Sequence, residues 1–287
     1  MNFWNYVSKN QNWARWLTIF KAIIFDIGQT LINYNNPLNW SKLYRAAFES
    51  ISDKCGYTFS DSHYQHAVRV LTKYNTRVNP RDYEVTSNQI FHEILSGMDI
   101  PMKDIEQVKF QFYLFFRQDA SVFPEVEETL KKLSYRGILL GTLSDVAYAM
   151  DNEYALEDIR MIRQYIDYPF TSNDTGYRKP RAEGLKFLAE KMQIDMKEMA
   201  FVGDEEKDVM CAANAGAYSI LINRNNKIKN YGQNKEINSL DELLVMFGWS
   251  LKLSIWDCKR SCVYKQKIFL DMNYICRKIL SHRNDFM

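Results

Sequence analysis

The sequence has few cysteines, and they are not arranged for cross-linking. Five are present among the 287 residues: Cys55, Cys211, Cys258, Cys262 and Cys276. Their density and spacing match neither a disulfide-bonded scaffold nor a zinc site, so we expect reduced thiols and a cytoplasmic protein. Cys258 and Cys262 lie four residues apart without a second Cys or His pair at zinc-site spacing, which favours two thiols on one helix face over metal ligands.

Long apolar segments are also missing. The sequence has no run of about 18 apolar residues, which argues against a transmembrane helix. The N-terminal segment is aromatic and polar and lacks an apolar stretch followed by a small-residue cleavage site, so it does not match a secretory signal. The composition, 46% hydrophobic and 25% charged, is that of a soluble protein with one large or two smaller domains.

Basic charge and tryptophan are concentrated at the two ends of the chain. The formal net charge is +2, but residues 1–20 carry two basic and no acidic side chains, and residues 249–287 carry eight basic and three acidic ones, so the segment between them is acidic. Five of the six tryptophans lie in these extensions: Trp4, Trp13, Trp16, Trp249 and Trp256.

Three interpretations of the extensions stay open. They can pack on each other or on the core, or they can form a docking surface for a protein partner or an anionic membrane face. Residues 1–20 can also precede the true start of the protein. The basic tail contains no recognisable nucleic-acid-binding module, so we expect no nucleic-acid partner.

The order of apolar segments predicts an α/β protein interrupted by a helical insertion. A strand-like run at 22–26 precedes polar and aromatic sequence with helical periodicity, which Gly56, Pro80, Gly97 and Pro101 divide into about four helices. Short apolar runs then alternate with amphipathic helices, as in a parallel sheet. Strands are predicted at 22–26, 138–143, 168–171, 199–202 and 218–222, and helices between them at 125–135, 181–192, 207–215 and 239–247.

We therefore predict a Rossmann-like parallel sheet core with three α/β/α layers and an inserted all-helical cap domain. The predicted divisions are an N-terminal extension at 1–20, the core at 21–35 and 121–248, the cap at 36–120, and a basic, aromatic C-terminal extension at 249–287.

Polar residues follow the ends of the predicted strands. In open sheets of this type, chemistry collects beyond the carboxyl ends of the strands. Several carboxylates, one hydroxyl and one lysine at that edge suit magnesium-assisted phosphoryl transfer. Taken singly, each residue is also explained as a helix cap, a turn or a surface charge. The set is Asp26, Ser144, Asp145, Lys179, Asp204 and Asp208.

In this order, the segments resemble the four motifs of the haloacid dehalogenase-like superfamily of aspartate-nucleophile phosphohydrolases. The matching segments are FDIGQTL, GTLSD, GYRKP and FVGDEEKD, the last followed by AANAGA. The similarity spans roughly residues 21–248, and the helical insertion resembles the family's mobile cap, placed directly after the first motif. The resemblance implies a phosphatase that uses Mg²⁺ and acts on a small phosphorylated metabolite.

The resemblance also implies roles for the matched residues. Asp26 would be the nucleophile that forms an aspartyl-phosphate, while Ser144 and Lys179 would assist catalysis by binding the phosphoryl group and balancing charge. Thr30, which orients the loop after the nucleophile, and Asp145 would complete the phosphate-binding set. Mg²⁺ would be held by Asp26, the backbone carbonyl of Gly28, Asp204 and Asp208, the last directly or through water, with Glu205 as a second candidate.

Gly28 departs from the family pattern. The family commonly has an aspartate there that protonates the leaving oxygen and later activates water, a contribution typically of about 10²- to 10⁴-fold. The metal site is unaffected, because a backbone carbonyl is available from any residue. The substrate can have a good leaving group, such as an acyl phosphate or a sugar 1-phosphate. Alternatively, Gln29, Asp145, Glu205 or a cap residue can substitute, or the protein is a weakly active phosphate-binding or regulatory protein.

Two related reactions fit less well. Haloacid dehalogenation needs no magnesium and would leave the acidic cluster unexplained, and a phosphomutase depends most on the missing acid.

In the predicted cap, Arg45, Arg77, Arg81 and Tyr83 can meet a phosphate or ring, although solvated helix faces also explain them. His63, His66 and His92 have no companion ligands and receive no role.

Overall fold

The computed structural model describes residues 20–246. Residues 1–19 and 247–287, which hold nearly all of both predicted extensions, lie outside this range, so the predictions for them stay predictions. The chain divides into two compact units, residues 1–243 and 244–287, and the sheet, the cap and the candidate site lie in the first. No helix within residues 20–246 combines the length and apolar character needed to cross a bilayer.

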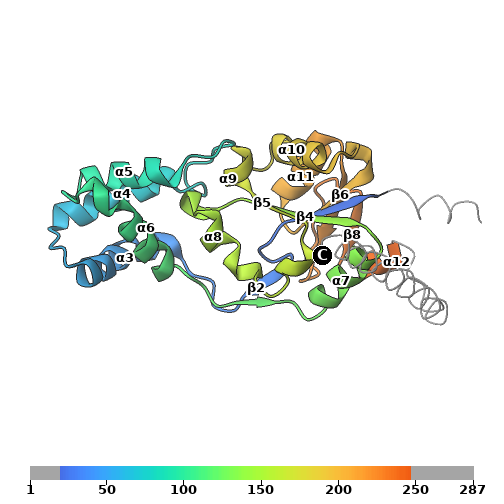
Figure 1. Cartoon of the computed structure of the whole chain (residues 1–287), viewed down its shortest axis with the longest axis horizontal. Coiled ribbons are helices and arrows are strands. Elements are labelled where there is room, and N and C mark those ends of the chain that lie inside the picture. The colour runs from blue at the N-terminus through green and yellow to red at the C-terminus, as the bar shows by residue number, and fades with distance from the viewer. Residues whose placement is uncertain (1–19, 247–287) are drawn as a thin grey trace, which may run out of the picture. The chain divides into compact units, whose positions relative to one another are not determined.

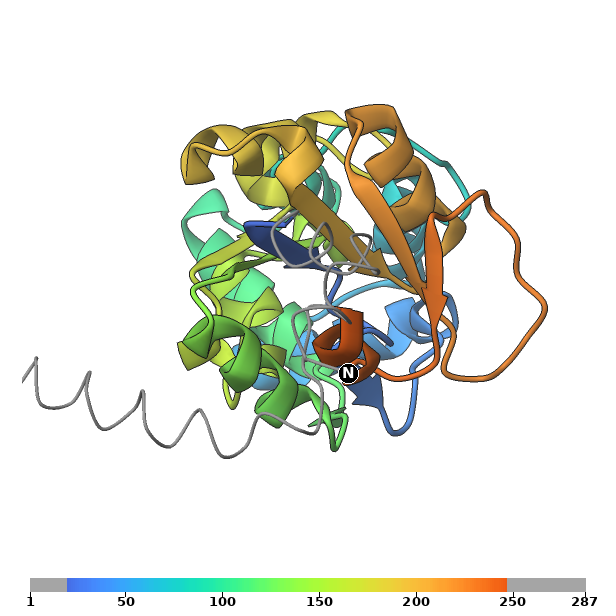
Figure 2. The same cartoon turned by 90° about the vertical axis from the view of Figure 1, so that its right-hand side faces the viewer.

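A six-stranded parallel sheet forms the centre of the first unit (Figures 1 and 2). Its strand order is β5-β4-β1-β6-β7-β8. The four residues of β1 are all apolar and fully buried, as expected for a central parallel strand covered on both faces. The strands are β1 (Ala22–Phe25), β4 (Leu139–Ser144), β5 (Tyr168–Thr171), β6 (Met199–Gly203), β7 (Tyr218–Ile222) and β8 (Lys235–Ile237).

The sequence missed β8, because its exposed Lys235 and Glu236 lack an apolar pattern. Charged residues are common on edge strands, where they oppose pairing with another chain.

Helices cover both faces of the sheet, which confirms the predicted three-layer core. Leu185 and Leu188 of α10 pack with Cys211 of α11 against Ile24 and Phe201 on one face, and α7 lies on the other face (Figures 1 and 2). The helices in this part of the chain are α7 (Val126–Tyr135), α10 (Glu183–Met192), α11 (Glu206–Ala215) and α12 (Glu242–Met246).

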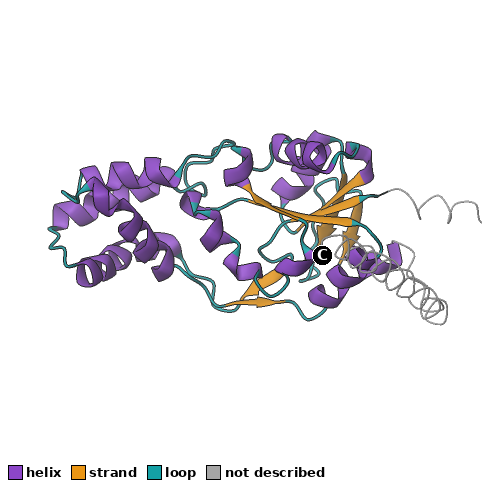
Figure 3. Cartoon of the chain, in the orientation of Figure 1, coloured by secondary structure: helices purple, strands orange, loops and turns teal. Residues whose placement is uncertain are grey.

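The inserted cap is helical (Figure 3). It has its own apolar core, which is rich in aromatic rings. Two of its helices stop at predicted breakers: α3 ends before Gly56, which adopts a positive φ of 74°, and α5 ends before Gly97. His63 has a structural role that the sequence did not suggest. Its backbone N–H donates to the Ser60 hydroxyl and its ring accepts the Ser60 backbone N–H, which forms a capping box at the start of α4. The helices are α3 (Trp40–Cys55), α4 (Asp61–Tyr74), α5 (Ser87–Ser96) and α6 (Ile105–Phe115).

A two-stranded antiparallel ribbon, absent from the sequence prediction, connects the cap to the core. The chain leaves the core through β2 (Ile32–Tyr34) and returns through β3 (Ala120–Val122), and the two strands pair. These strands have only three residues each, which is too short for a periodic signal in the sequence. The ribbon places Tyr34 close to the end of β1.

A second connection joins the cap loop between α4 and α5 to the core. The carboxylate of Glu84 is buried, forms ion pairs with Arg81 and Arg178, and accepts a hydrogen bond from Ser172 at 2.7 Å. Arg81 therefore has a buried structural role and is neither a solvated charge nor a free ligand. Because Arg178 directly precedes Lys179, the cap loop contacts the segment that carries this lysine.

Candidate active site

Three adjacent strands bring the predicted residues to one edge of the sheet. β1 lies between β4 and β6, with Phe25 paired to Thr142 on one side and Val202 on the other. Asp26, Ser144 and Asp204 therefore follow at neighbouring strand ends. Thr142 itself faces away from solvent and donates its hydroxyl to the Phe170 carbonyl at 3.1 Å, which is a structural contact.

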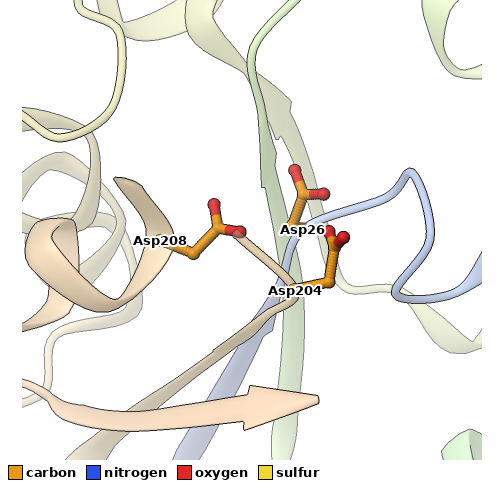
Figure 4. A group of neighbouring side chains, drawn as sticks. All are labelled: Asp26, Asp204 and Asp208. Carbon is orange, nitrogen blue, oxygen red and sulfur yellow. The ribbon is translucent and has the colours of Figure 1, made fainter. Parts of the chain in front are cut away.

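Three carboxylates form a compact cluster at this edge. Asp26 extends from the end of β1, Asp204 lies between β6 and α11, and Asp208 lies in the first turn of α11 (Figure 4). One ligand oxygen from each lies within 4.8 Å of the others. Burial, together with the charges of Asp26 and Asp208, raises the pKa of Asp204 to about 7. The cluster thus carries negative charge that its surroundings only partly offset.

Lys179 lies inside this cluster. Its side chain is 1% exposed, and its Nζ lies 2.6 Å from Asp26 Oδ1 and 2.7 Å from Asp208 Oδ1. Burial opposes its charge, but the Asp208 and Asp26 carboxylates prevail and raise the pKa of Lys179 well above its usual value. The lysine is therefore charged at neutral pH, and it holds the Asp26 carboxylate in position.

Gly203 allows Asp208 to reach the cluster. A Cβ at position 203 would overlap Cβ, Cγ and Oδ2 of Asp208. The same Oδ2 accepts a hydrogen bond from the backbone N–H of Glu205 at 2.9 Å, closing a capping box at the start of α11. Glycine is thus required here by close approach.

Gly203→Ala is expected to lower the free energy of unfolding by about 1–3 kcal/mol, because the added methyl must displace the Asp208 carboxylate. Gly28→Ala is the matched control, since a Cβ at position 28 would make an ordinary contact at 3.5 Å from Tyr34 Cε2. Urea denaturation of both variants measures the difference. Equal stability of the two variants would contradict the steric assignment of Gly203.

The remaining predicted residues occupy different environments. Ser144 and Asp145 line the same cavity as Asp26. The Asp145 carboxylate accepts a hydrogen bond from the backbone N–H of Lys179 at 3.0 Å. Thr30 is fully buried, and its hydroxyl has no hydrogen-bond partner among the described residues. Glu205 forms an ion pair with Lys207 at 2.8 Å.

The cluster has the donor chemistry that Mg²⁺ requires. Magnesium prefers hard oxygen ligands and is usually bound through one or two carboxylates with water and substrate phosphate. Lys179 pairs with two of the three carboxylates. Burial, and after it the charges of Asp26 and Asp208, raises the pKa of Asp204, and a divalent cation would offset these charges. Asp26 and Asp204 would be the main ligands, because both Asp208 oxygens already have partners.

An aromatic ring occupies the space beside Gly28. Tyr34 lies next to this position, and its hydroxyl donates a hydrogen bond to Asp158 Oδ2 at 3.2 Å. Burial, and then the negative charge of Asp158, raises the pKa of Tyr34 above its usual value. Burial also raises the pKa of Asp158, although its hydrogen bond with Tyr34 opposes this. The sequence did not suggest this pair, because the two residues lie 124 positions apart.

A cavity of about 930 Å³ lies above the carboxylate cluster. Its walls combine the strand ends, including Asp26, Ser144 and Asp204, with cap residues. Ligand sites commonly have volumes of about 300–1,000 Å³. Of the predicted cap residues, Arg77 lines this cavity, whereas Arg45 pairs with Glu49 and Asp61 on the cap surface.

Comparison with known proteins supports the resemblance of the four sequence motifs to those of haloacid dehalogenase-like hydrolases. A family model for haloacid dehalogenase-like hydrolases matches residues 20–216. The chain is 30% identical to the phosphoglycolate phosphatase of Escherichia coli (strain K12) over 152 residues, which are 50% of this chain and 57% of that protein. It is 29% identical over 102 residues to the phosphoglycolate phosphatase of Vibrio parahaemolyticus, covering 36% and 44% of the two chains. The chain therefore spans only about half the length of these curated relatives.

Solved structures share the fold. A haloacid dehalogenase-like phosphatase from Thermococcus onnurineus matches with a TM-score of 0.53 and 23% identity, over 80% of this chain and 98% of that one. A 2-haloacid dehalogenase from Pseudomonas syringae matches with a TM-score of 0.58 and 19% identity, over 81% and 100%. Because these two proteins are named for different reactions, the fold alone does not choose between the reactions.

Proposed function

The chain belongs to the haloacid dehalogenase-like hydrolases, and we propose that it is a Mg²⁺-dependent phosphohydrolase acting on a small phosphorylated metabolite. One observation carries the proposal: Asp26 lies at the end of the central strand, held by the buried Lys179, beside two further carboxylates. This arrangement suits a carboxylate nucleophile next to a metal. A dehalogenase would have no need for the additional carboxylates.

The chain's own residues would carry the reaction in two steps. The Asp26 carboxylate attacks phosphorus, the bond to the leaving oxygen breaks, and an aspartyl-phosphate forms; water then attacks this phosphorus and restores Asp26. Lys179 orients Asp26 and offsets charge on the phosphoryl oxygens, to which Ser144 donates a hydrogen bond. Bound Mg²⁺ would supply further neutralisation of charge on the transferring group.

We further propose that the enzyme is selective for good leaving groups. Two of the substitute acids suggested by the sequence are unsuitable. Burial raises the pKa of Asp145, but the nearby charges of Lys179, Arg178 and Lys207 outweigh it, so this pKa is lowered. Lys207 likewise outweighs burial and lowers the pKa of Glu205. Gln29 has no ionisable proton. The raised pKa of Tyr34 makes its hydroxyl a weak acid, and its proton is directed to Asp158.

Phosphate release from a panel of phosphorylated compounds tests the function. Release is expected in the presence of Mg²⁺, and its loss with EDTA is expected to be reversed by added Mg²⁺. The panel includes acetyl phosphate, aryl phosphates of graded leaving-group pKa, and 2-phosphoglycolate, the compound for which the curated relatives are named. Binding of phosphate esters without release from any of them would instead support the phosphate-binding alternative.

The same panel tests the selectivity. The rate of the chemical step is expected to fall steeply as the leaving-group pKa rises, with 2-phosphoglycolate among the slow substrates. Gly28→Asp is expected to speed the hydrolysis of substrates with poor leaving groups by about 10²-fold or more. Gly28→Asn, which introduces the uncharged isostere of aspartate, is not expected to do so. A flat dependence would contradict the selectivity.

A further inference from the structure

The cap contributes an apolar wall to the cavity. Phe110 and Leu114 lie four residues apart on one face of α6, and both line the cavity. They are 43% and 40% exposed, whereas their neighbours Phe112 and Tyr113 are buried in the cap. Exposed apolar side chains that border an active-site cavity indicate a surface for an apolar part of a ligand.

Aromatic rings extend this wall. Tyr154 belongs to α8 (Asn152–Ala155), which follows the end of β4, and it also lines the cavity. Its ring centroid lies 6.3 Å from that of Phe110 and 5.3 Å from that of Tyr113. Three rings from the cap and the core thus border one side of the cavity. Aromatic rings at such separations offer faces and edges on which a further ring can pack.

The size of the cavity and the glycine at position 28 both favour a substrate with an aromatic leaving group. A leaving group as small as glycolate would leave most of the 930 Å³ unfilled. Phenolic alcohols, with a pKa of about 10, depart without protonation far more readily than alkyl alcohols. A site that has glycine in place of the usual acid therefore matches an aromatic alcohol in its chemistry as well as in its shape.

We propose that the substrate is the phosphate ester of an aromatic alcohol, whose ring packs on the wall formed by Phe110, Leu114 and Tyr154. This proposal rests on the proposed phosphohydrolase function and names its substrate class. Contacts between this wall and the ring would strengthen substrate binding. The reaction at Asp26 is the one proposed above: the aryl oxygen leaves as the phosphoryl group is transferred to the carboxylate.

Binding of non-hydrolysable analogues separates recognition of the ring from turnover. With Mg²⁺ present, 1-naphthylmethylphosphonate is expected to bind at least about tenfold more tightly than methylphosphonate by calorimetry. Phe110→Ala is expected to remove about tenfold of this preference and to leave methylphosphonate binding unchanged. Met102→Ala is the control, because Met102 is an exposed apolar side chain of the cap outside the cavity lining.

Hydrolysis provides the second readout. Phe110→Ala is expected to lower kcat/KM for 1-naphthyl phosphate about tenfold, mainly through KM, and to change kcat/KM for acetyl phosphate, which has a good leaving group and no ring, less than twofold. Equal affinity of the wild type for both phosphonates, or equal losses of kcat/KM on both substrates, would overturn the ring site. Tight binding of the naphthyl phosphonate without phosphate release from either substrate would overturn the proposed activity and support the ring site.

Discussion

Asp26→Asn is expected to reduce phosphate release by about 10⁴-fold or more, as is usual when a nucleophile is removed. The amide has nearly the same shape as the carboxylate, but it cannot attack phosphorus to give an aspartyl-phosphate. Folding is expected to persist, because Lys179 retains its ion pair with Asp208. Phosphate release with Mg²⁺ and acetyl phosphate gives the rate, and thermal unfolding shows whether the variant is folded.

Asp53→Asn is the matched control for this variant. Asp53 is exposed on the cap helix α3 and is not among the residues that line the cavity. The rate of phosphate release by Asp53→Asn is therefore expected to equal that of the wild type. Covalent phosphate trapped by rapid acid quenching in the wild type, and absent from Asp26→Asn, is expected as well. Activity of Asp26→Asn within tenfold of the wild type would overturn the nucleophile assignment.

Lys179→Met is expected to lower the free energy of unfolding by about 3–5 kcal/mol, the range observed when one partner of a buried ion pair is removed. The Lys179 side chain is 1% exposed and pairs with two carboxylates, so methionine leaves both without their cation. Phosphate release is expected to disappear too. Urea denaturation measures the stability, with Lys186→Met, at an exposed position on α10, as the control.

The stability deficit of Lys179→Met is expected to shrink from neutral to mildly acidic pH. Burial raises the pKa of Asp208 even with the lysine present, and removing the lysine raises it further. A carboxyl whose pKa is higher in the folded than in the unfolded protein destabilises the fold where it is ionised, and this penalty is relieved as the pH falls through the folded pKa. A deficit below about 1 kcal/mol at neutral pH would contradict the role of Lys179 as the buried counter-ion.

The sequence predicted those parts of the fold that depend on neighbours along the chain. Five strands and the helices between them have apolar runs or helical periodicity over several residues, and each is present, with the predicted bounds of β5 and β7 matching those observed. The short or polar strands β2, β3 and β8 were missed, because a three-residue strand is stabilised by its pairing partner more than by its own pattern.

For the candidate site, the sequence supplied the residues and the structure supplied their relationships. Asp26, Ser144 and Asp204 could be expected at one edge, since parallel strands end on the same side of the sheet. The contact between Lys179 and Asp26 joins residues 153 positions apart. The Tyr34–Asp158 hydrogen bond and the Glu84–Arg178 ion pair likewise join distant segments, so local patterns contain no sign of them.

By itself, the sequence determined the order of the longer strands and helices, the family, and the absence of a side chain at position 28, because all of these are local properties of the chain. Only the tertiary structure decided what lies around that position: a tyrosine ring beside Gly28, three carboxylates whose charge one buried lysine only partly offsets, and a cavity with an exposed aromatic wall. These features depend on burial and on distances between segments far apart in sequence, and both arise only when the chain has packed.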